Sequence, residues 1–546
     1  MGDYDVVVLG TGAAGLTAAI AAHEGGARVA LFEKAETVGG TSAWSGGQIW
    51  IPNNPHELAA GREDSREKAL TYLMALSHGM IDRRMAETFI DTGPEMIRFL
   101  EERTPVRFVA VPDFPDYHPE FPGGMPEGGR TLECPTFPYG ELGEWRDRVG
   151  VSPYFPDYTY TIGETTLGQP VPMPASPEVK EYRRANDERG MGLALIGRLL
   201  KGCLDRGLVP QTGCRATELM MADSIVAGVR FEGLQGAFAV EARNVILATG
   251  GFEWNPDLVR AFSRGPLTHP VSIPTNTGDG LKMAMRVGAM LGNMREAWWM
   301  PVIEVPTEIN AMGRQLLTYE RTMPGSLMVN RRGRRFTNEA SNYNAFGAAF
   351  HEQDVSRFDY ANLPCWLIFN QEFYAKWPFV GGLPDAFGEG ARPPQWIPGA
   401  DTLADLAELV GIDAEGLGLA VARFNAHALE GHDPDFRRGE SANDLWWGDP
   451  AHRGDKRATL GPLGPGPYYA IEVKSGTLGT KGGPQTDTDA RVLDVDGRPI
   501  SGLYAAGNAM ASPMGMTYGG AGGTLGPAMV FGYRAGLAAA AETVAT

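Results

Sequence analysis

A glycine motif between an apolar strand and a small-residue helix, at the start of the chain, constrains the fold more than any other sequence feature. Residues 5–9 have the composition of a buried strand, Gly10-Thr-Gly-Ala-Ala-Gly15 follows at once, and residues 16–23 have the composition of a helix. Strand, glycine turn and helix in this order form the dinucleotide-binding Rossmann unit. The sequence therefore predicts an α/β fold with a Rossmann-like domain at its beginning.

Each glycine of this motif has an expected role. Gly10 permits the tight turn, Gly12 lets the backbone approach a pyrophosphate, and Gly15 packs the helix against the strand. The helix N-terminus would face the phosphates, because its partial positive charge stabilises an anion. A second apolar stretch, residues 28–32, is followed by Glu33, roughly 20 residues after Gly10, where dinucleotide-binding folds carry the carboxylate that binds a ribose hydroxyl.

Three further segments favour FAD over NAD. Residues 39–47 contain two runs of small residues that would let backbone amides line a long adenine-to-flavin axis. Residues 244–251 and 502–508 each have the pattern of a strand that runs into a glycine turn. In addition to Gly10, Gly12, Gly15 and Glu33, the predicted cofactor-binding residues are Ala13, Ala14, Lys34, Gly40, Thr41, Ser42, Ser45, Gly46, Gly47, Ala248, Thr249, Gly250, Asn276, Asp279, Gly507, Asn508, Gly523 and Leu525.

On these motifs the chain resembles, over nearly its whole length, the superfamily of FAD-dependent fumarate reductases and 3-ketosteroid dehydrogenases. The resemblance implies a Rossmann-like, glutathione-reductase-like FAD-binding domain with an inserted α+β catalytic cap domain. We accordingly expect residues 1–287 to form the first segment of the FAD-binding domain and residues 471–546 to form the second. Residues 288–470, which are richer in Trp, Met and Phe, would be the catalytic domain.

Residues 121–177 form an expected irregular insertion in the first FAD segment. The stretch is rich in proline, glycine and aromatic residues, and loops of such length are usually functional or disordered. Two interpretations stay open for it. It is either a solvent-exposed decoration, or a lid or patch that docks on a membrane in which a lipid-like substrate partitions.

Three tyrosine-bearing motifs narrow the resemblance to 3-ketosteroid Δ1-dehydrogenases. Phe114-Pro-Asp-Tyr117, Asn338-Glu-Ala-Ser-Asn-Tyr343 and Tyr518-Gly-Gly-Ala-Gly522 match, in order, the places where that family carries catalytic tyrosines and a glycine amide. The chain departs from the family at Gly519 and Ala521, where prolines are common. This departure loosens the loop that aims the Gly522 amide.

The resemblance implies a role for each of these residues in the 1,2-desaturation of a 3-oxosteroid. The Tyr518 hydroxyl and the Gly522 N–H would stabilise the ketone oxygen as it becomes enolate-like. Tyr343 would remove a proton from C2 while a hydride leaves C1 for the flavin. Tyr117 would bond to Tyr343, because a phenol with a pKa of about 10 needs a partner to gain phenolate character. Trp299, Tyr343 and Tyr518 would contact the substrate.

Other activities in the same superfamily stay open. A 3-ketosteroid Δ4-(5α)-dehydrogenase uses a tyrosine from the region that corresponds to residues 466–470. A fumarate-reductase-like enzyme carries a histidine where this chain has Thr480-Lys481, which disfavours dicarboxylate reduction. A non-enzymatic flavin-binding module would need no organised tyrosines. Because residues 41–44 contain no histidine, FAD is expected to be bound non-covalently.

Composition excludes several other classes of protein. The net charge of −18 at pH 7 disfavours nucleic acid as a partner. The four cysteines lack a CxxC pair and the nine histidines lack HExxH spacing, so we expect neither disulfides nor a metal site. No apolar run reaches the ~18 residues of a membrane span. We expect a cytoplasmic enzyme, peripheral at the membrane if the insertion docks there, with a 3-ketosteroid substrate and a quinone-like or other electron acceptor.

Overall fold

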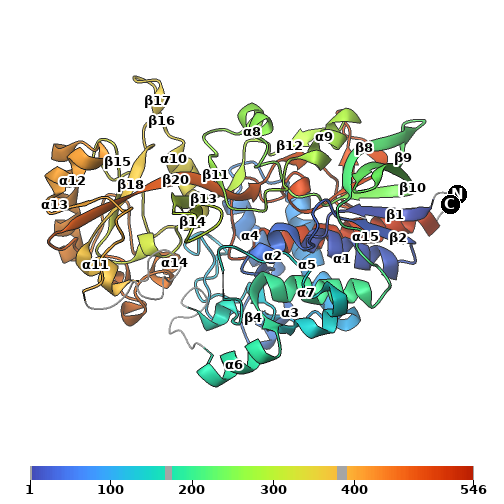
Figure 1. The fold of residues 1–546 in the computed structure, drawn as a ribbon, viewed down its shortest axis with the longest axis horizontal. Helices are drawn as coiled ribbons and strands as arrows, with labels where there is room; N and C mark the ends of the chain where they lie inside the picture. Colours follow the sequence, from blue (N-terminus) through green and yellow to red (C-terminus); the bar gives the residue numbers. More distant parts are fainter. Residues whose placement is uncertain (1–2, 156, 166–174, 378–389, 545–546) are drawn as a thin grey trace.

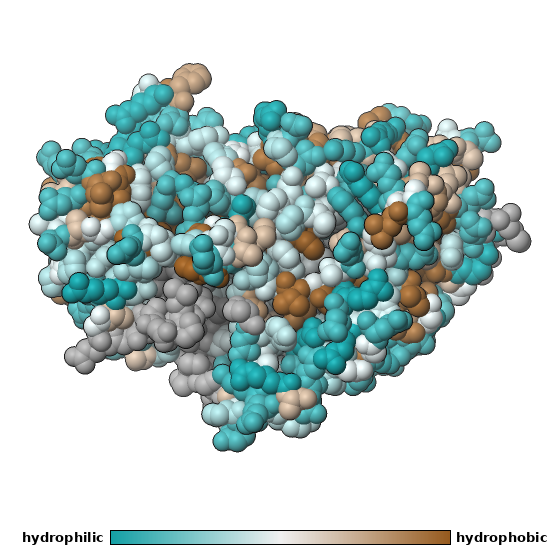
Figure 2. All heavy atoms as spheres, viewed as in Figure 1, coloured by the Kyte–Doolittle hydropathy of each residue, from teal (hydrophilic) through white to brown (hydrophobic). Residues whose placement is uncertain are grey.

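The computed structural model describes residues 3–155, 157–165, 175–377 and 390–544. Two seven-stranded sheets organise this part of the chain: one combines strands from both ends of the sequence, and the other is built from its middle (Figure 1). In these ranges no helix has the length and apolar character needed to cross a bilayer. The face in Figure 2 is mainly hydrophilic, with apolar side chains in small separate groups.

The first sheet is the predicted Rossmann-like sheet. Its strands run in the order β2-β1-β10-β23-β22, and the first four are parallel to their neighbours. Residues 6–9 and 245–247 are buried, as is usual for parallel strands that are covered on both faces. The strands are β1 (Tyr4–Leu9), β2 (Val29–Phe32), β10 (Gly236–Leu247), β23 (Pro499–Ala505) and β22 (Arg491–Leu493), with β8 (Arg215–Ala222) and β9 (Ile225–Gly233) joined through β10.

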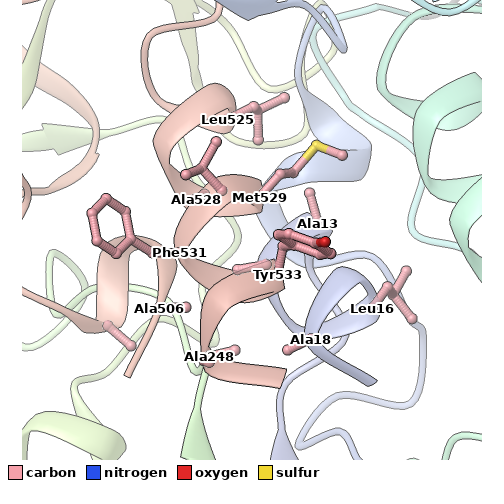
Figure 3. Packing of buried hydrophobic residues seen from close by; sticks show 14 of the residues in the cluster. Ala13, Leu16, Ala18, Ala248, Ala506, Leu525, Ala528, Met529, Phe531 and Tyr533 are labelled. Atoms are coloured by element: carbon pink, nitrogen blue, oxygen red, sulfur yellow. The ribbon is translucent and has the colours of Figure 1, made fainter. Parts of the chain in front are cut away.

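Two helices from opposite ends of the chain pack closely beside this sheet (Figure 3). They are α1 (Ala13–Glu24) and α15 (Leu525–Val544). A β-carbon on Gly532 would lie 2.4 Å from the Ala14 carbonyl oxygen, and one on Gly536 would lie 2.3 Å from the Ala18 carbonyl oxygen. Only glycine therefore permits this approach, which fixes the helix that follows the glycine motif.

The second sheet forms a half with helices on its faces, at the left of Figure 1. Its strands run antiparallel in the order β14-β13-β20-β18-β15, and β11 and β19 also pair with β20. These strands are β14 (Arg314–Leu316), β13 (Ala297–Glu304), β20 (Tyr468–Thr480), β18 (Cys365–Asn370), β15 (Leu327–Asn330), β11 (His269–Pro270) and β19 (Gly399–Ala400). Apolar residues of α12 and α13 pack on β15 and β18, so this half has the expected α+β character.

The remaining helices and short strands connect and cover the two halves. The helices are α2 (Gly40–Trp44), α3 (Pro55–Ala59), α4 (Arg66–Ala75), α5 (Arg83–Arg103), α6 (Pro177–Ala185), α7 (Met191–Leu204), α8 (Pro256–Phe262), α9 (Asp279–Arg286), α10 (Phe346–Phe350), α11 (Gln371–Lys376), α12 (Leu403–Val410), α13 (Ala414–Glu430) and α14 (Ala442–Trp446). The short strands are β3 (Ile49–Trp50), β4 (Val109–Ala110), β5 (Thr131–Glu133), β6 (Phe137–Pro138), β7 (Glu188–Arg189), β12 (Leu291–Gly292), β16 (Gln353–Asp354), β17 (Asp359–Tyr360) and β21 (Gly483–Pro484).

One expected segment boundary falls inside a strand. The boundary between residues 470 and 471 lies within β20, which remains paired with β13 as far as Thr480 opposite Ala297. Because a strand belongs to the sheet with which it pairs, we propose that the chain returns to the FAD-binding half after Thr480. The other expected boundary, between residues 287 and 288, directly follows α9 and stays as proposed.

The described part of residues 121–177 is more regular than expected. β5 pairs with β3 and β4, and β6 pairs with β7. Phe137, Tyr139 and Trp145 are buried, which disfavours a solvent-exposed decoration for this portion. Strands of two or three residues are too short to show the alternation of apolar and polar residues by which a strand is recognised in a sequence. Residue 156 and residues 166–174 of this insertion lie outside the described residues.

Candidate active site

Among the described residues, a large cavity joins the two halves of the molecule. It has a volume of about 1890 Å³ including its open mouth, and its walls come from the glycine motif, both chain ends and the second sheet. Because these walls extend from the glycine motif to the second sheet, the cavity can hold a dinucleotide at one end and a second molecule at the other.

The glycine motif forms the floor of one end of the cavity. Gly10 has a φ of +108°, and a β-carbon there would lie 2.3 Å from the Ala248 carbonyl oxygen. A β-carbon on Gly15 would lie 1.9 Å from the Gly10 carbonyl oxygen. Gly15 consequently packs the helix against the glycine turn and does not line the cavity, whereas Gly10 and Gly12 do.

Glu33 lines the same end, directly after β2. Its carboxylate accepts hydrogen bonds from the Thr11 N–H at 3.0 Å, the Thr11 hydroxyl at 2.6 Å and the Ala35 N–H at 2.9 Å. A carboxylate has about four acceptor positions, so capacity remains for a ligand hydroxyl. Sequence reasoning missed Thr11 because a threonine inside a glycine motif has no expected partner until β2 lies beside it.

Polar groups from distant segments meet along one cavity wall. Asn276 donates to the Thr41 hydroxyl at 3.1 Å and to the buried Glu253 carboxylate at 2.8 Å. Lys34 forms an ion pair with Asp279 at 2.9 Å, which neutralises its charge. These contacts fix the orientation of Asn276 and Thr41 before any ligand arrives.

Nearly all the predicted cofactor-binding residues line this cavity. The exceptions are Gly15 and Gly523, and a β-carbon on Gly523 would lie 3.0 Å from the Tyr518 ring. The Thr249 hydroxyl and the Gln48 side-chain amide nitrogen are buried in the lining residues without a hydrogen-bond partner among the described residues. Buried polar atoms require partners, so the residues present fit a polar ligand such as a dinucleotide.

Three tyrosines from separate segments meet at the other end of the cavity. The Tyr117 hydroxyl donates to the Tyr343 hydroxyl at 3.0 Å. The ring centroids lie 5.4 Å apart for Tyr117 and Tyr343, 5.1 Å for Tyr117 and Tyr518, and 5.5 Å for Tyr343 and Tyr518. The Tyr518 hydroxyl accepts from the Thr524 hydroxyl at 3.1 Å. All four side chains belong to the cavity wall.

Burial keeps these tyrosines neutral when no ligand is bound. Desolvation raises the pKa of Tyr117 and of Tyr343 well above the ordinary value for tyrosine, and it also raises the pKa of Tyr518. A neutral phenol suits Tyr518 as a hydrogen-bond donor. A base at Tyr343, however, needs more than the hydrogen bond from Tyr117 to gain phenolate character.

Hydrogen bonds hold the loop that follows Tyr518, although it lacks the prolines of the resembling family. The Gly519 carbonyl accepts from the Tyr72 hydroxyl at 2.7 Å and from the Tyr117 N–H at 3.0 Å. Gly522 has a φ of +95°, and a β-carbon there would lie 2.5 Å from backbone atoms of Ile49. Among the described residues, no protein acceptor bonds to the Gly522 N–H, which leaves it available to a ligand.

An apolar wall, which the sequence analysis did not identify, surrounds the tyrosines. Its residues come from residues 114–162, from β13, β14 and β20, and from loops, so no local pattern connects them. They are Phe114, Tyr154, Phe155, Ile162, Val271, Met300, Leu316, Thr318, Trp447 and Leu478.

The predicted substrate residue Trp299 does not line the cavity, which disfavours a direct contact with the substrate. It packs against His351 at 4.5 Å between ring centroids and donates to Glu296 at 3.3 Å. Its neighbour Trp298 packs against Tyr518 at 4.9 Å between ring centroids and donates to Asn508 at 3.0 Å. Successive residues of a strand point to opposite faces, which explains why only one of the two tryptophans adjoins the site.

Comparison with known proteins gives consistent matches over the full chain. Residues 5–525 match the family described as FAD binding domain. The chain is 41% identical to 4-oxocyclohexanecarboxylate 2-dehydrogenase of Sinomonas cyclohexanicum, over 98% of this chain and 92% of that protein. It is 37% identical to 3-oxosteroid 1-dehydrogenase of Mycobacterium tuberculosis, over 98% of both proteins. The crystal structure of 3-ketosteroid Δ1-dehydrogenase from Sterolibacterium denitrificans with 1,4-androstadiene-3,17-dione superposes with a TM-score of 0.90 at 34% identity, over 99% of both chains.

The fold and these matches define an FAD-dependent oxidoreductase, and the predicted fold class and cofactor are confirmed. The chain belongs to the family of FAD-binding flavoproteins that includes 3-oxosteroid 1-dehydrogenases and fumarate-reductase-like members.

Proposed function

We propose that this protein is a 3-oxosteroid 1-dehydrogenase, which introduces the C1–C2 double bond into the A ring of a 3-ketosteroid. The observation that carries the proposal is the meeting of the Tyr117–Tyr343 hydroxyl pair, Tyr518 and the free Gly522 N–H in one cavity with the cofactor-binding residues. Relatives that carry this activity by name, at 36–37% identity over the full chain, support it.

The residues divide the chemistry between two sides of a ring ketone. Tyr518 and the Gly522 N–H would donate to the C3 oxygen, and because Tyr518 accepts from Thr524 its own proton is free for that oxygen. Tyr343, once deprotonated, would take the proton from C2, and the Tyr117 hydroxyl would stabilise the charge on the Tyr343 oxygen. Bound FAD supplies the acceptor for the hydride that leaves C1.

The walls of the cavity favour an uncharged substrate. Among the described lining residues Lys34 is the one lysine or arginine, and it is paired with Asp279 near the predicted cofactor-binding residue Asn276. A carboxylate buried against apolar walls without a cation would cost several kcal/mol or neutralise itself. A polycyclic ketone fits this wall better than 4-oxocyclohexanecarboxylate does, although the 41% identity makes oxidation of that compound our second candidate.

The contacts in and near the cavity disfavour Δ4-(5α)-dehydrogenation and dicarboxylate reduction. Tyr468 and Tyr469, which a Δ4-(5α)-dehydrogenase would bring to its site, do not line the cavity, and Tyr469 bonds to Gln371 at 3.0 Å instead. No histidine lines the described cavity wall, and Lys481 donates to the Thr517 carbonyl at 2.7 Å rather than to an open site. These contacts disfavour dicarboxylate reduction, and the missing histidine also agrees with our proposal of non-covalent FAD.

The electron acceptor and the location of the enzyme remain proposals. We retain a quinone-like or other small acceptor, because a flavin enzyme of this class must be reoxidised after each turnover. In the described part of residues 121–177, Phe121 and Val151 are the two exposed large apolar side chains. Two residues offer little apolar area for a membrane patch, so peripheral attachment through this insertion would require further contacts.

The test is anaerobic mixing of the FAD-loaded protein with three ketones, followed by identification of the products. Androst-4-ene-3,17-dione should bleach the flavin and yield the 1,4-diene, and 5α-androstane-3,17-dione should yield the 1-ene rather than the 4-ene. 4-Oxocyclohexanecarboxylate should bleach it at least roughly tenfold more slowly because of its unpaired charge. Bleaching by the carboxylate alone would reject the steroid assignment, and no bleaching by any ketone would leave only a flavoprotein.

A further inference from the structure

Arg321 is a buried arginine directly behind the segment that carries Tyr343. Its side chain is 2% exposed. The guanidinium donates to the Leu317 carbonyl at 3.3 Å, to the Ser341 carbonyl at 2.7 Å and to the Glu339 carbonyl, and it lies over the Phe346 ring at 4.6 Å. Each of these contacts is with a backbone carbonyl or an aromatic ring.

Arg321 differs from the other fully buried arginines in having no direct carboxylate partner. Arg130 pairs with Asp64 at 2.6 Å, and Arg438 pairs with Glu339 at 3.2 Å. Among the described residues, no carboxylate oxygen lies within 4.0 Å of the Arg321 guanidinium. A buried charge without a counterion is costly and usually has a function.

The charged groups around Arg321 lie farther away. Glu320, Asp444 and Glu339 favour its charged form, whereas Arg438 and above all burial oppose it. Together they lower the pKa of Arg321 to about 9, so the guanidinium remains charged at neutral pH. The charge is thus available to act on neighbouring groups.

Arg321 acts on the tyrosine pair in two indirect ways. The Ser341 carbonyl that it holds lies two residues before Tyr343, so the arginine anchors the backbone from which that side chain projects. Its positive charge also lowers the pKa of Tyr117, opposing the effect of burial.

Few other titratable groups face the Tyr117–Tyr343 pair. Tyr518 raises the pKa of both tyrosines. His118, next to Tyr117, contacts Asn342 at 3.1 Å and Glu120 at 3.7 Å rather than either hydroxyl. Arg321 is the positively charged side chain that acts on Tyr117.

We propose that Arg321 is a positioning residue that makes Tyr343 usable as a base: it anchors residues 339–341 and provides the positive charge that stabilises phenolate on the Tyr117–Tyr343 pair. The proton balance is simple: Tyr343 loses its proton to solvent before turnover and then receives one from C2 of the substrate. This inference rests on the proposed function. A neighbouring positive charge favours the charged form of an acid, which opposes the effect of burial.

The experiment compares Arg321→Gln, which keeps N–H donors without charge, with Arg321→Lys, which keeps the charge. In the FAD-loaded enzyme, Arg321→Gln should lower kcat at neutral pH by about 10-fold to 100-fold, because one pKa unit changes the phenolate fraction about tenfold. Its KM should stay within about threefold, and the acidic limb of the kcat profile should move about one to two units toward alkaline pH. Arg321→Lys should return that limb to within about half a unit of the wild-type position.

Arg438→Lys is the matched control, because Arg438 is equally buried and bonds to three backbone carbonyls but does not act on the tyrosines. It should lower thermal stability without moving the limb. If Arg321→Gln loses the same factor of kcat at every pH with its limb unmoved, the role is structural and the proposal is wrong. Where Arg321→Gln does not retain FAD, Arg321→Met replaces it in the same comparison.

A second readout does not depend on turnover. The tyrosinate absorbance near 295 nm should contain a transition that is absent from Tyr343→Phe, and Arg321→Gln should shift this transition to higher pH. A shift in this titration supports the role of Arg321 even if no steroid is oxidised, in which case only the proposed function has failed. If the wild-type enzyme oxidises the steroid but Arg321→Gln does not shift this transition, the inference about Arg321 is wrong and the proposed function stands.

Discussion

At the scale of single residues, the three tyrosine hydroxyls differ in their hydrogen-bond partners. Tyr518 accepts from Thr524, whereas Tyr343 accepts from Tyr117. Burial raises the pKa of Tyr117, Tyr343 and Tyr518 alike. We therefore propose that the roles of donor and base depend on these hydrogen bonds and, for the pair, on Arg321.

Replacing Tyr518 with phenylalanine tests the donor role. Tyr518→Phe should lower kcat by about 10²–10³-fold and raise KM for the ketone, because one of two donors to the developing oxyanion is lost. Tyr469→Phe is the control, because Tyr469 also has a hydrogen-bonded hydroxyl but lies outside the cavity wall. Steady-state kinetics with androst-4-ene-3,17-dione would measure both. A Tyr518→Phe enzyme within about twofold of wild type would remove Tyr518 from the mechanism.

Replacing Tyr343 with phenylalanine tests the base. Tyr343→Phe should lower kcat by about 10²–10⁴-fold, as for loss of a general base, while FAD stays bound. Because Tyr343 must be deprotonated to act, the remaining activity should also lose the rise with pH that wild type shows. Rapid anaerobic flavin reduction measures the chemical step directly. Flavin reduction by Tyr343→Phe at the wild-type rate would contradict the assignment.

At the scale of elements, one hydroxyl of α4 connects two of the tyrosine-bearing segments. The Tyr72 hydroxyl donates to the Gly519 carbonyl at 2.7 Å and accepts from the His118 N–H at 3.1 Å. One segment carries Tyr117 and the other carries Tyr518. The bonds explain how a loop with glycine and alanine in place of prolines keeps a fixed conformation.

Tyr72→Phe should therefore impair catalysis although Tyr72 does not line the cavity. Loss of the hydroxyl leaves the His118 N–H without its partner and leaves the Gly519 carbonyl with the Tyr117 N–H as its remaining donor, which should lower the free energy of unfolding by about 1–3 kcal/mol. Misplacement of Tyr117 and the Gly522 N–H should lower kcat by roughly 10–100-fold. Tyr139→Phe is the matched control, because the buried Tyr139 hydroxyl bonds to the Leu193 carbonyl at 2.8 Å and not to a tyrosine-bearing motif. This variant should lose stability while its kcat stays unchanged.

The contact between α1 and α15 leads to a prediction about cofactor binding. A β-carbon on Gly532 would clash with the Ala14 carbonyl in the first turn of α1, the turn that lines the cavity. Gly532→Ala should push the two helices apart and lower FAD affinity by at least about tenfold, despite the higher helix propensity of alanine. Gly418→Ala is the control because the space around Gly418 in α13 is open, and it should raise stability by up to about 1 kcal/mol. Fluorescence titration of the apo-protein with FAD would measure the affinities, and equal affinities would show that the helix contact does not set the site.

At the scale of the whole molecule, the sequence predicted those features that a local motif carries. The glycine motif, Glu33 and the small-residue runs predicted the Rossmann sheet and nearly all of the cavity wall around the cofactor, because each lies next to the strand that positions it. The three tyrosine motifs, identified by resemblance, do meet in the structure. The apolar wall, Thr11 and Arg321 were not predicted, because their contacts join residues far apart in sequence. Trp299 was predicted to contact the substrate but does not line the cavity, because the composition of β13 does not reveal which face of the strand meets the site.

The arrangement of the whole chain makes FAD a structural link between its two halves. The predicted cofactor-binding residues come from both ends of the chain, and the same cavity continues to Met300 and Leu316 of the second sheet. A ligand that binds only the folded protein adds about 2.7 kcal/mol of stability at a concentration 100 times its Kd. Removal of FAD should therefore lower Tm, and differential scanning calorimetry of the apo-protein should resolve separate transitions where the holo-protein shows one. Addition of FAD should restore the single transition, whereas androst-4-ene-3,17-dione alone should not, because it contacts only the tyrosine end. Apo-protein and holo-protein with the same single transition would mean that protein contacts alone couple the two halves.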